Sequence, residues 1–317
     1  MRLPTARGWA QALRGLSFEL ARGQTMGLIG ESGCGKSLTA LAVMGLLPER
    51  AQVTGSIRLN GTELLGLSDA QMCAWRGSRM AMIFQEPMTA LNPLHTIGRQ
   101  IAEPLQLHQG LSASQARARA LELLDRVQLP RARERLEAYP HQLSGGQRQR
   151  VMISIALACS PDLLIADEPT TALDVTVQKE VLALIRQLVH EEGMGLLLIS
   201  HDLGLMQDQV EQVMVMYGGQ CVESAATEEL FAQRAHPYTR GLFAARPRLG
   251  MVRGTRLATI AGQVPELIDL PKGCAFSERC PLGVADCALQ APLAEPIPAR
   301  VAVLVEHRVR CPRWRLS

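Results

Sequence analysis

The chain has 317 residues, of which 47% are hydrophobic, 20% charged and 3% aromatic, and its formal net charge is +3. This length allows one large domain and a smaller one, while the small charge and few aromatic residues argue against a nucleic-acid partner. No apolar run approaches the roughly 20 residues of a membrane span, and the first residues lack a signal-peptide core, so we expect a soluble, cytoplasmic protein.

The N-terminal part predicts two strands followed by a phosphate-binding loop. Alternating residues over Ala12–Leu20 indicate a strand, and the apolar stretch Met26–Ile29 indicates a buried one. The next eight residues, GESGCGKS from Gly30 to Ser37, fit the pattern G-x-x-x-x-G-K-[ST]. An apolar helix is expected to follow over Leu38–Leu47.

The residue types of this loop suit a bound polyphosphate. Gly33 and Gly35 let the backbone curve so that successive N–H groups point inward at the start of the helix. Lys36 would reach the outer phosphates, and the Ser37 hydroxyl would ligate Mg²⁺. A glycine-rich turn without a ligand is the alternative, but the agreement of strand, loop, Lys-Ser pair and helix favours a nucleotide site.

The middle of the chain predicts a helical subdomain inserted into a sheet domain. Gly55–Leu65 contains an Asn-Gly turn and predicts a hairpin, and Met80–Phe84 predicts a strand that ends at Gln85. From about residue 86 to 160 the pattern is helical. Ser112 and Gln115 indicate a capping box, for a helix with the apolar stripe Ala113, Ala116, Ala120, Leu124 and Val127.

The stretch LSGGQ, Leu143–Gln147, precedes a helix that we expect to run to about Cys159. Ser144, Gly145 and Gly146 would present free N–H groups at the N-terminus of that helix, which is a second anion-binding surface. A single nucleotide rarely needs two such devices from one molecule.

A carboxylate pair follows the next buried strand, LLIAD over Leu163–Asp167. Asp167 could hold Mg²⁺ beside the phosphates, and Glu168 could polarise the water that attacks the γ-phosphate. The alternative is a strand-end turn with two solvated acids. A further buried strand, Gly195–Ser200, ends at His201, and the alternation of strands with helices indicates an α/β fold with a largely parallel sheet.

After about Phe231 prolines recur and periodicity fades, so we expect a separate, loop-rich extension over 233–317. It contains Cys274, Cys280, Cys287 and Cys311 in the spacing C-x₅-C-x₆-C-x₂₃-C. Four thiolates suit an iron–sulfur cluster or a closed zinc site, and free thiols are the third possibility. The spacing alone does not choose among them.

In their order, the phosphate loop, LSGGQ, LLIADEP and the histidine after the next strand make residues 10 to 230 resemble an ATP-binding-cassette (ABC) ATPase. The resemblance implies a P-loop NTPase fold and a pair of cassettes, each using its Ser144–Gln147 segment on ATP bound to the other. It implies that Gln85 ligates Mg²⁺ or water, that Asp174 contacts the opposite site and that His201 holds the γ-phosphate. The ATP contacts that it implies are Gly30, Gly33, Cys34, Gly35, Lys36, Ser37 and Leu38.

Two features depart from the family pattern. Family members begin with another strand before the one predicted at Ala12, and the chain is too short there to supply it. An aromatic residue normally stacks on adenine, and Trp9 lies near that position but one residue out of register. A surface tryptophan in a mobile N-terminus is the alternative.

Finer motifs resemble the ATPases of dipeptide, oligopeptide and nickel importers. These motifs are MIFQEPMTALNP (Met82–Pro93), YPHQLSGGQ, HPYTRGLF (His236–Phe243) and the cysteine-rich extension. The resemblance implies a [4Fe–4S] cluster on the four cysteines, docking on two membrane permeases near residues 86–93, and a solute-binding protein that selects the cargo.

We therefore expect residues 1–232 to form the nucleotide-binding domain of a peptide importer, acting peripherally at the cytoplasmic face of the plasma membrane, in the inner membrane of a bacterium. The partner ATPase is expected to be a different subunit. A nickel or metallophore importer is the alternative within the family. A non-transport ABC ATPase acting on nucleic acid or ribosomes, and a redox-responsive regulator, are the alternatives outside it.

Overall fold

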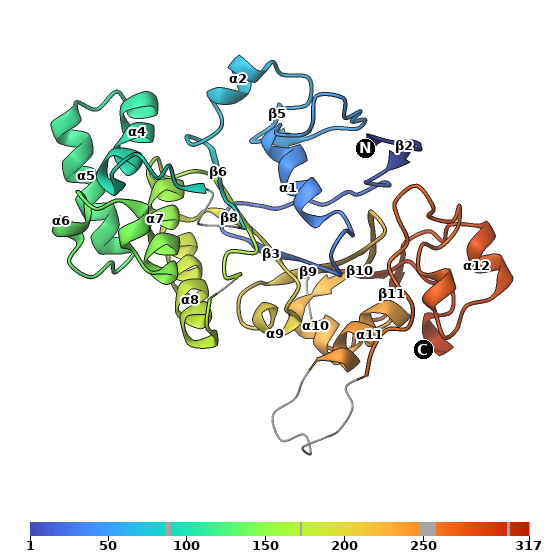
Figure 1. The fold of residues 1–317 in the computed structure, drawn as a ribbon. Helices are drawn as coiled ribbons and strands as arrows, with labels where there is room; N and C mark the ends of the chain where they lie inside the picture. The colour runs from blue at the N-terminus through green and yellow to red at the C-terminus, as the bar shows by residue number, and fades with distance from the viewer. Residues whose placement is uncertain (86–89, 172, 247–257, 303–304, 317) are drawn as a thin grey trace. The chain divides into compact units, whose positions relative to one another are not determined.

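A computed structural model describes residues 1–85, 90–171, 173–246, 258–302 and 305–316 (Figure 1). The chain divides into two compact units. The first comprises 1–19, 26–56 and 200–317, and the second comprises 20–25 and 57–199. Of the motif EPMTALNP, residues 86–89 lie outside the described parts of the chain.

The first unit is built on strands in the order β11-β12-β10-β9-β3. Strand β3 (Thr25–Ile29) is buried along its whole length and runs parallel to β9 (Gln212–Tyr217). Strand β10 (Gln220–Ala226) returns antiparallel to β9, and β12 (His307–Val309) and β11 (Glu295–Ile297) extend the sheet from there.

The first unit contains five helices among its described residues. They are α1 (Lys36–Met44), α9 (Leu203–Met206), α10 (Thr227–Ala232), α11 (Pro237–Ala245) and α12 (Ala285–Leu289). Short 3₁₀ turns lie at Ser277–Arg279 and Trp314–Leu316. Sequence periodicity did not predict the helices and strands beyond residue 233; apart from the nine-residue α11, each of them is only three to five residues long.

A buried polar cluster joins β12 to the rest of the first unit. The His307 ring lies between two carboxylates, with Nε2 2.9 Å from Glu223 Oε1 and Nδ1 3.1 Å from Glu229 Oε1, and all three side chains are fully buried. Glu223 also accepts from the amides of Ala235 and His236. Burying ionisable side chains costs free energy unless they form hydrogen bonds. The hydrogen bonds of this cluster offset that cost.

The second unit contains three parallel strands in the order β8-β7-β6, which are Gly195–Ser200, Leu163–Asp167 and Met80–Ile83. The predicted hairpin is present as β4 (Arg58–Leu59) and β5 (Thr62–Glu63), with Asn60 and Gly61 both at positive φ. That conformation is the one that a two-residue Asn-Gly turn requires.

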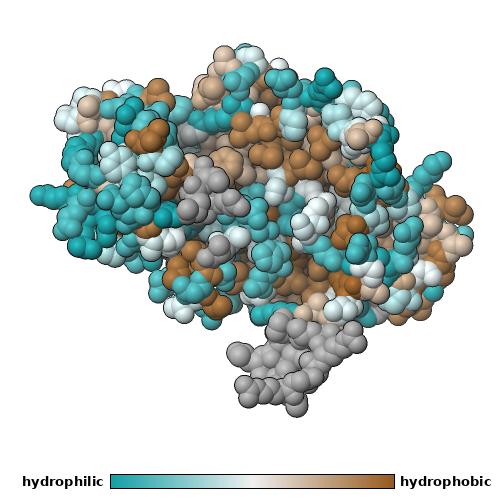
Figure 2. Space-filling view, in the orientation of Figure 1, coloured by the Kyte–Doolittle hydropathy of each residue, from teal (hydrophilic) through white to brown (hydrophobic). Residues whose placement is uncertain are grey.

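Helices of the second unit are α2 (Asp69–Cys73), α4 (Ile97–Gln109), α5 (Ala113–Arg126), α6 (Ala132–Arg135), α7 (Gly145–Leu157) and α8 (Val175–Glu192), with a 3₁₀ turn at Pro140–Gln142. The capping box predicted at Ser112 is confirmed, since its hydroxyl accepts from Gln115 N and the Gln115 side chain accepts from Ser112 N. Hydrophilic side chains predominate over α5 and α6 on the face drawn in Figure 2.

Two local predictions are wrong. Residues 12–20 form no strand; the Ala12 amide bonds to Met1 and the Arg14 amide to Gly219, so these donors do not form a single ladder. The missing N-terminal strand is present, because β1 (Arg2–Thr5) and β2 (Gly8–Gln11) form an antiparallel hairpin.

In the predicted stripe of α5, Ala113 is exposed while Ala116, Ala120 and Leu124 are buried. Ala113 occupies the first turn, where the helix has only begun to reach the core. Within the described residues, no helix combines the length and apolar character that crossing a membrane requires.

Candidate functional site

The phosphate loop, Gly30–Ser37, connects β3 to α1 in the first unit. Gly35, at φ 104°, lies immediately before the first residue of α1, and no side chain of the described residues caps the helix there. Amide groups at such an end are available to a phosphate. A Cβ at Gly30 would lie 2.3 Å from the Met216 carbonyl oxygen, so any other residue would displace the loop.

The Lys36 ammonium group lies across this loop. Nζ donates to the carbonyl oxygens of Gly30 at 2.8 Å and Glu31 at 3.1 Å, and the residue is only 6% exposed. Cys34 is buried beside it, and burial raises the pKa of this thiol. Ser37 and Leu38 are half-buried in the first turn of α1.

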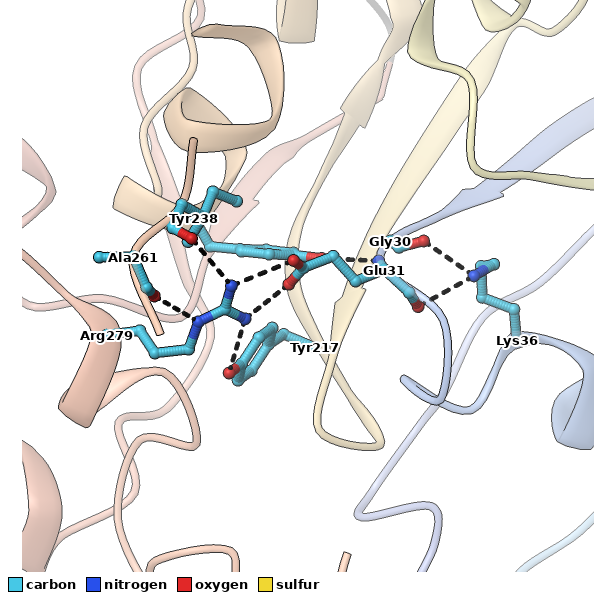
Figure 3. Close-up of polar contacts among 8 residues, drawn as sticks. Gly30, Glu31, Lys36, Tyr217, Tyr238, Ala261 and Arg279 are labelled. Carbon is cyan, nitrogen blue, oxygen red and sulfur yellow. Dashed lines mark hydrogen bonds and ion pairs between the residues drawn. The ribbon is translucent and has the colours of Figure 1, made fainter. Parts of the chain in front are cut away.

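Two residues of the C-terminal part hold Glu31, the second residue of the loop (Figure 3). Tyr238 Oη accepts a hydrogen bond from Glu31 N at 2.8 Å, and Arg279 donates two to the Glu31 carboxylate, at 2.6 and 3.1 Å. The hydrogen bonds that Arg279 donates to Glu31 raise the pKa of its guanidinium. Sequence reasoning missed both residues; the only local signals were the HPYT motif and the arginine directly before Cys280.

The carboxylate pair lies in the second unit, where β7 ends. Asp167 is buried, and Glu168 follows at φ 46°, a left-handed conformation that is uncommon outside glycine. Glu168 Oε2 accepts from Gln85 Nε2 at 3.0 Å and from Thr171 Oγ1 at 3.1 Å. Gln85 and Glu168, predicted separately from two strand ends, are therefore in direct contact.

The LSGGQ segment opens α7 of the second unit. Ser144 is the N-cap residue, and it forms a capping box with Gln147. Ser144 and Gly145 are exposed, and a Cβ at Gly146 would lie 2.9 Å from Val177 Cγ1. Asp174 caps α8 in the same way, since its carboxylate accepts from the amides of Thr176 and Val177.

His201 and Trp9 both belong to the first unit. His201 directly follows β8 and is exposed. Trp9 lies in β2, opposite Pro4, and is 49% exposed, which leaves its ring accessible for stacking.

The four cysteines of the extension line one cavity of about 480 Å³, together with His236 and Arg310. Burial raises the pKa of Cys274, of Cys280 and, to about 11, of Cys311. Across the described ranges, no group of three or more His, Cys, Asp or Glu residues is arranged to hold a metal ion.

Two known families match the chain. The family described as "ABC transporter" matches residues 13–171, and the family described as "Oligopeptide/dipeptide transporter, C-terminal region" matches residues 222–287. The first covers every motif from the phosphate loop to Glu168. The second covers Tyr238, Arg279 and three of the four cysteines of the extension.

Similar curated proteins are transport ATP-binding proteins. The "Oligopeptide transport ATP-binding protein OppD" of Mycobacterium tuberculosis is 49% identical over 306 residues, covering 96% of this chain and 49% of that protein. This chain thus spans about half the length of the mycobacterial relative. The "Probable peptide ABC transporter ATP-binding protein y4tR" of Sinorhizobium fredii is 48% identical over 307 residues, covering 96% of this chain and 89% of that protein.

Among solved structures, the ATP-binding cassette MJ0796 "bound to ADP and Pi", in a dimeric post-hydrolysis state, is similar with a TM-score of 0.64 and 27% identity. The likeness covers 71% of this chain and 95% of that one. The α/β fold is therefore that of an ABC cassette.

Proposed function

The chain belongs to the ABC transporter family, and from this premise we propose that it is the ATP-binding and ATP-hydrolysing subunit of a peptide importer. The observation that carries the proposal is the contact between Gln85 and Glu168 at the carboxyl end of β7. It brings a candidate Mg²⁺ ligand next to a candidate general base, and nucleotide hydrolysis uses both kinds of group. The peptide cargo is supported by the relatives' names and by the match to the importer C-terminal region.

In this proposal each motif residue has a separate task. Lys36 and the amide groups from Gly33 to Leu38 bind the β- and γ-phosphates, and Trp9 stacks on the base. Ser37, Gln85 and Asp167 are the residues that would hold Mg²⁺, which would supply positive charge against the phosphate oxygens. Glu168 accepts a proton from the attacking water, which His201 helps to orient.

We propose that a second cassette completes each site. The Ser144–Gln147 segment at the start of α7, in which Ser144 and Gly145 are exposed, is suited to bind the γ-phosphate of ATP held by another subunit, because a helix N-terminus favours an anion. Asp174 would contact the opposite site from the start of α8. Related importers that pair two different ATPases favour a sister subunit as the partner.

The remaining partners follow from the family. We propose residues 1–232 as the nucleotide-binding domain, residues 233–317 as the importer-type extension, and peripheral attachment at the cytoplasmic face of the membrane. Two permeases would dock near residues 90–93, and a solute-binding protein would deliver cargo to them.

Replacing the candidate base tests the hydrolytic part of the proposal. The variant Glu168→Gln should bind ATP with unchanged affinity but hydrolyse it at least about a hundredfold more slowly, because proton abstraction by a carboxylate is lost. The measurements are fluorescent-ATP titration and phosphate release. Glu122→Gln, an exposed carboxylate paired with Arg119 on α5, is the matched control and should retain full turnover. Wild-type turnover by Glu168→Gln would overturn the assignment.

We further propose that the cysteine-lined cavity binds a [4Fe–4S] cluster through Cys274, Cys280, Cys287 and Cys311. Four thiols around one cavity support it, since clusters of this type use four cysteines. Anaerobically purified protein should show a broad visible absorption band and about four irons per chain. Cys287→Ser should lose both, whereas Cys73→Ser, an exposed cysteine of α2, should keep both. A chain that contains zinc and no such band would contradict this proposal.

A further inference from the structure

Three groups of Glu31 form hydrogen bonds, although Glu31 occupies one of the variable positions of the G-x-x-x-x-G-K-[ST] pattern. Its amide donates to Tyr238 Oη at 2.8 Å, its carboxylate accepts two hydrogen bonds from Arg279, and its carbonyl oxygen accepts from Lys36 Nζ at 3.1 Å (Figure 3). The residue therefore joins the phosphate-binding lysine to the C-terminal part of the chain.

Hydrogen bonds and aromatic rings hold the Arg279 guanidinium in one orientation. Its side chain is 5% exposed, and besides Glu31 it donates to Ala261 O at 2.8 Å and Tyr217 Oη at 3.2 Å. The guanidinium carbon lies 5.7 Å from the centre of the Tyr217 ring and 5.9 Å from that of Phe276. A planar, two-pronged contact of this kind orients a carboxylate as well as attracting it.

The contribution of the Arg279–Glu31 ion pair depends on how deeply it is buried. Pairs on the surface, such as Arg308 with Glu306 in the same extension, contribute little because water screens them. Glu31 is only 29% exposed by side chain, and its partner is nearly inaccessible. Removing Glu31 leaves the Arg279 guanidinium buried without its counter-charge, which destabilises the fold more than the loss of a surface pair does.

Arg279 also lies next to the cysteine-lined cavity. It is the last residue of the one-turn helix Ser277–Arg279, which Cys274 and Cys280 flank, and hydrogen bonds from Ser277 N to Cys274 O (3.0 Å) and Cys280 N to Ser277 O (3.4 Å) fix that turn. Tyr238 lies on α11 and packs against Phe276, which immediately precedes the turn, with ring centres 5.3 Å apart. Phe276, Ser277 and Cys280 line the cavity, so the turn at its edge also carries the arginine that holds Glu31.

We propose that Arg279, together with Tyr238, is a positioning residue for the phosphate loop. By holding Glu31 it keeps the Gly30 and Glu31 carbonyl oxygens, and through them the Lys36 ammonium, in place before nucleotide arrives. A loop that is already ordered spends less of the binding free energy on ordering itself. The C-terminal extension therefore sets the affinity for MgATP, an inference that rests on the proposed ATPase function.

The test compares steady-state ATP hydrolysis by the full chain and by Arg279→Gln, Glu31→Gln and the double variant, each assembled with the partner cassette. Each single variant should raise KM for MgATP about tenfold while kcat stays within about twofold, because bound nucleotide restores the loop. The double variant should be no worse than either single one, because both remove the same contact. Arg279→Lys keeps the charge without the fork and should fall between Arg279→Gln and the wild type.

The matched control is Arg308→Gln, an exposed arginine of the same extension, which should leave KM unchanged. Thermal melting of each variant separates a loss of positioning from a loss of fold, since partial unfolding lowers kcat and leaves KM alone. If Arg279→Gln does not fold, Glu31→Gln alone gives the answer from the other side of the contact.

An unchanged KM in Glu31→Gln, or additive effects in the double variant, would overturn the inference. Failure of the proposed function looks different: the wild-type chain would then bind no fluorescent ATP, or Lys36→Ala would bind it as well as the wild type does.

Discussion

His307 is a single residue whose charge state affects the stability of the first unit. Burial lowers the pKa of this imidazole, but the hydrogen bonds and charges of Glu223 and Glu229 outweigh burial, so its pKa lies above the usual 6.5. The pKa of Glu229 is lowered: burial raises it, but hydrogen bonds from the Val301 amide and from His307 outweigh that effect. The protonated ring between two carboxylates is therefore the stable arrangement.

The sign of the pH dependence follows from these directions. A raised histidine pKa contributes stability that is complete below about pH 6.5 and is lost as the pH rises through the folded-state value. A lowered glutamate pKa contributes stability that is present above about pH 4.5 and is lost as the pH falls through the folded-state value. The cluster therefore contributes most between these two limits.

The variant His307→Gln should reduce the free energy of unfolding by roughly 2–3 kcal/mol at pH 5.5, because two buried carboxylates lose their cation. The difference from wild type should shrink as the pH rises. Urea unfolding at pH 5.5, 7 and 9 measures it, with the exposed His190 replaced by Gln as the control. A difference that grows with pH would show that the ring is neutral in the folded state.

At the scale of elements, two helices begin in the same way but do different work. Ser112 at α5 and Ser144 at α7 each form a capping box with the glutamine three residues later. Only Ser144 belongs to the segment that we assign to a second subunit's nucleotide. Comparing Ser112 with Ser144 therefore distinguishes the effect of helix capping from the effect of ligand binding.

Ser112→Ala and Ser144→Ala should each lower the free energy of unfolding by about 1 kcal/mol, the usual effect of losing an N-cap. Only Ser144→Ala should also lower ATP turnover, by about tenfold or more, because the outward-facing N-terminus loses a phosphate contact. Equal turnover in the two variants, measured at equal folded fraction, would mean that Ser144 is only a cap.

The elements that sequence predicted correctly share a local cause. Strands β3, β7 and β8 are continuous apolar runs, and α5 and α7 begin at capping residues that are readable within four positions. Residues 12–20 also alternate, but the backbone amides of Ala12 and Leu13 donate to Met1, and that of Arg14 donates to Gly219. Alternation describes a surface that could form a ladder, whereas the partner lies elsewhere in the chain.

At the scale of the whole molecule, the sequence predicted the motifs of the site but not the distant residues that hold them in place. The pattern from Gly30 to Ser37 identified the phosphate loop because its chemistry is confined to eight consecutive residues. Arg279 is separated from Glu31 by 248 positions, and Glu223 from His307 by 84. No periodicity connects residues so far apart, so only the folded structure reveals that the extension supports the loop.

The same separation has a consequence for synthesis. At 5–20 residues per second, a ribosome needs roughly 12–50 s to add the residues from Glu31 to Arg279. Throughout that interval the nascent phosphate loop lacks its contact with Arg279. If Arg279 positions the loop as we propose, full nucleotide affinity arises only after Arg279 has been added. Translation itself would delay ATP capture by unfinished chains.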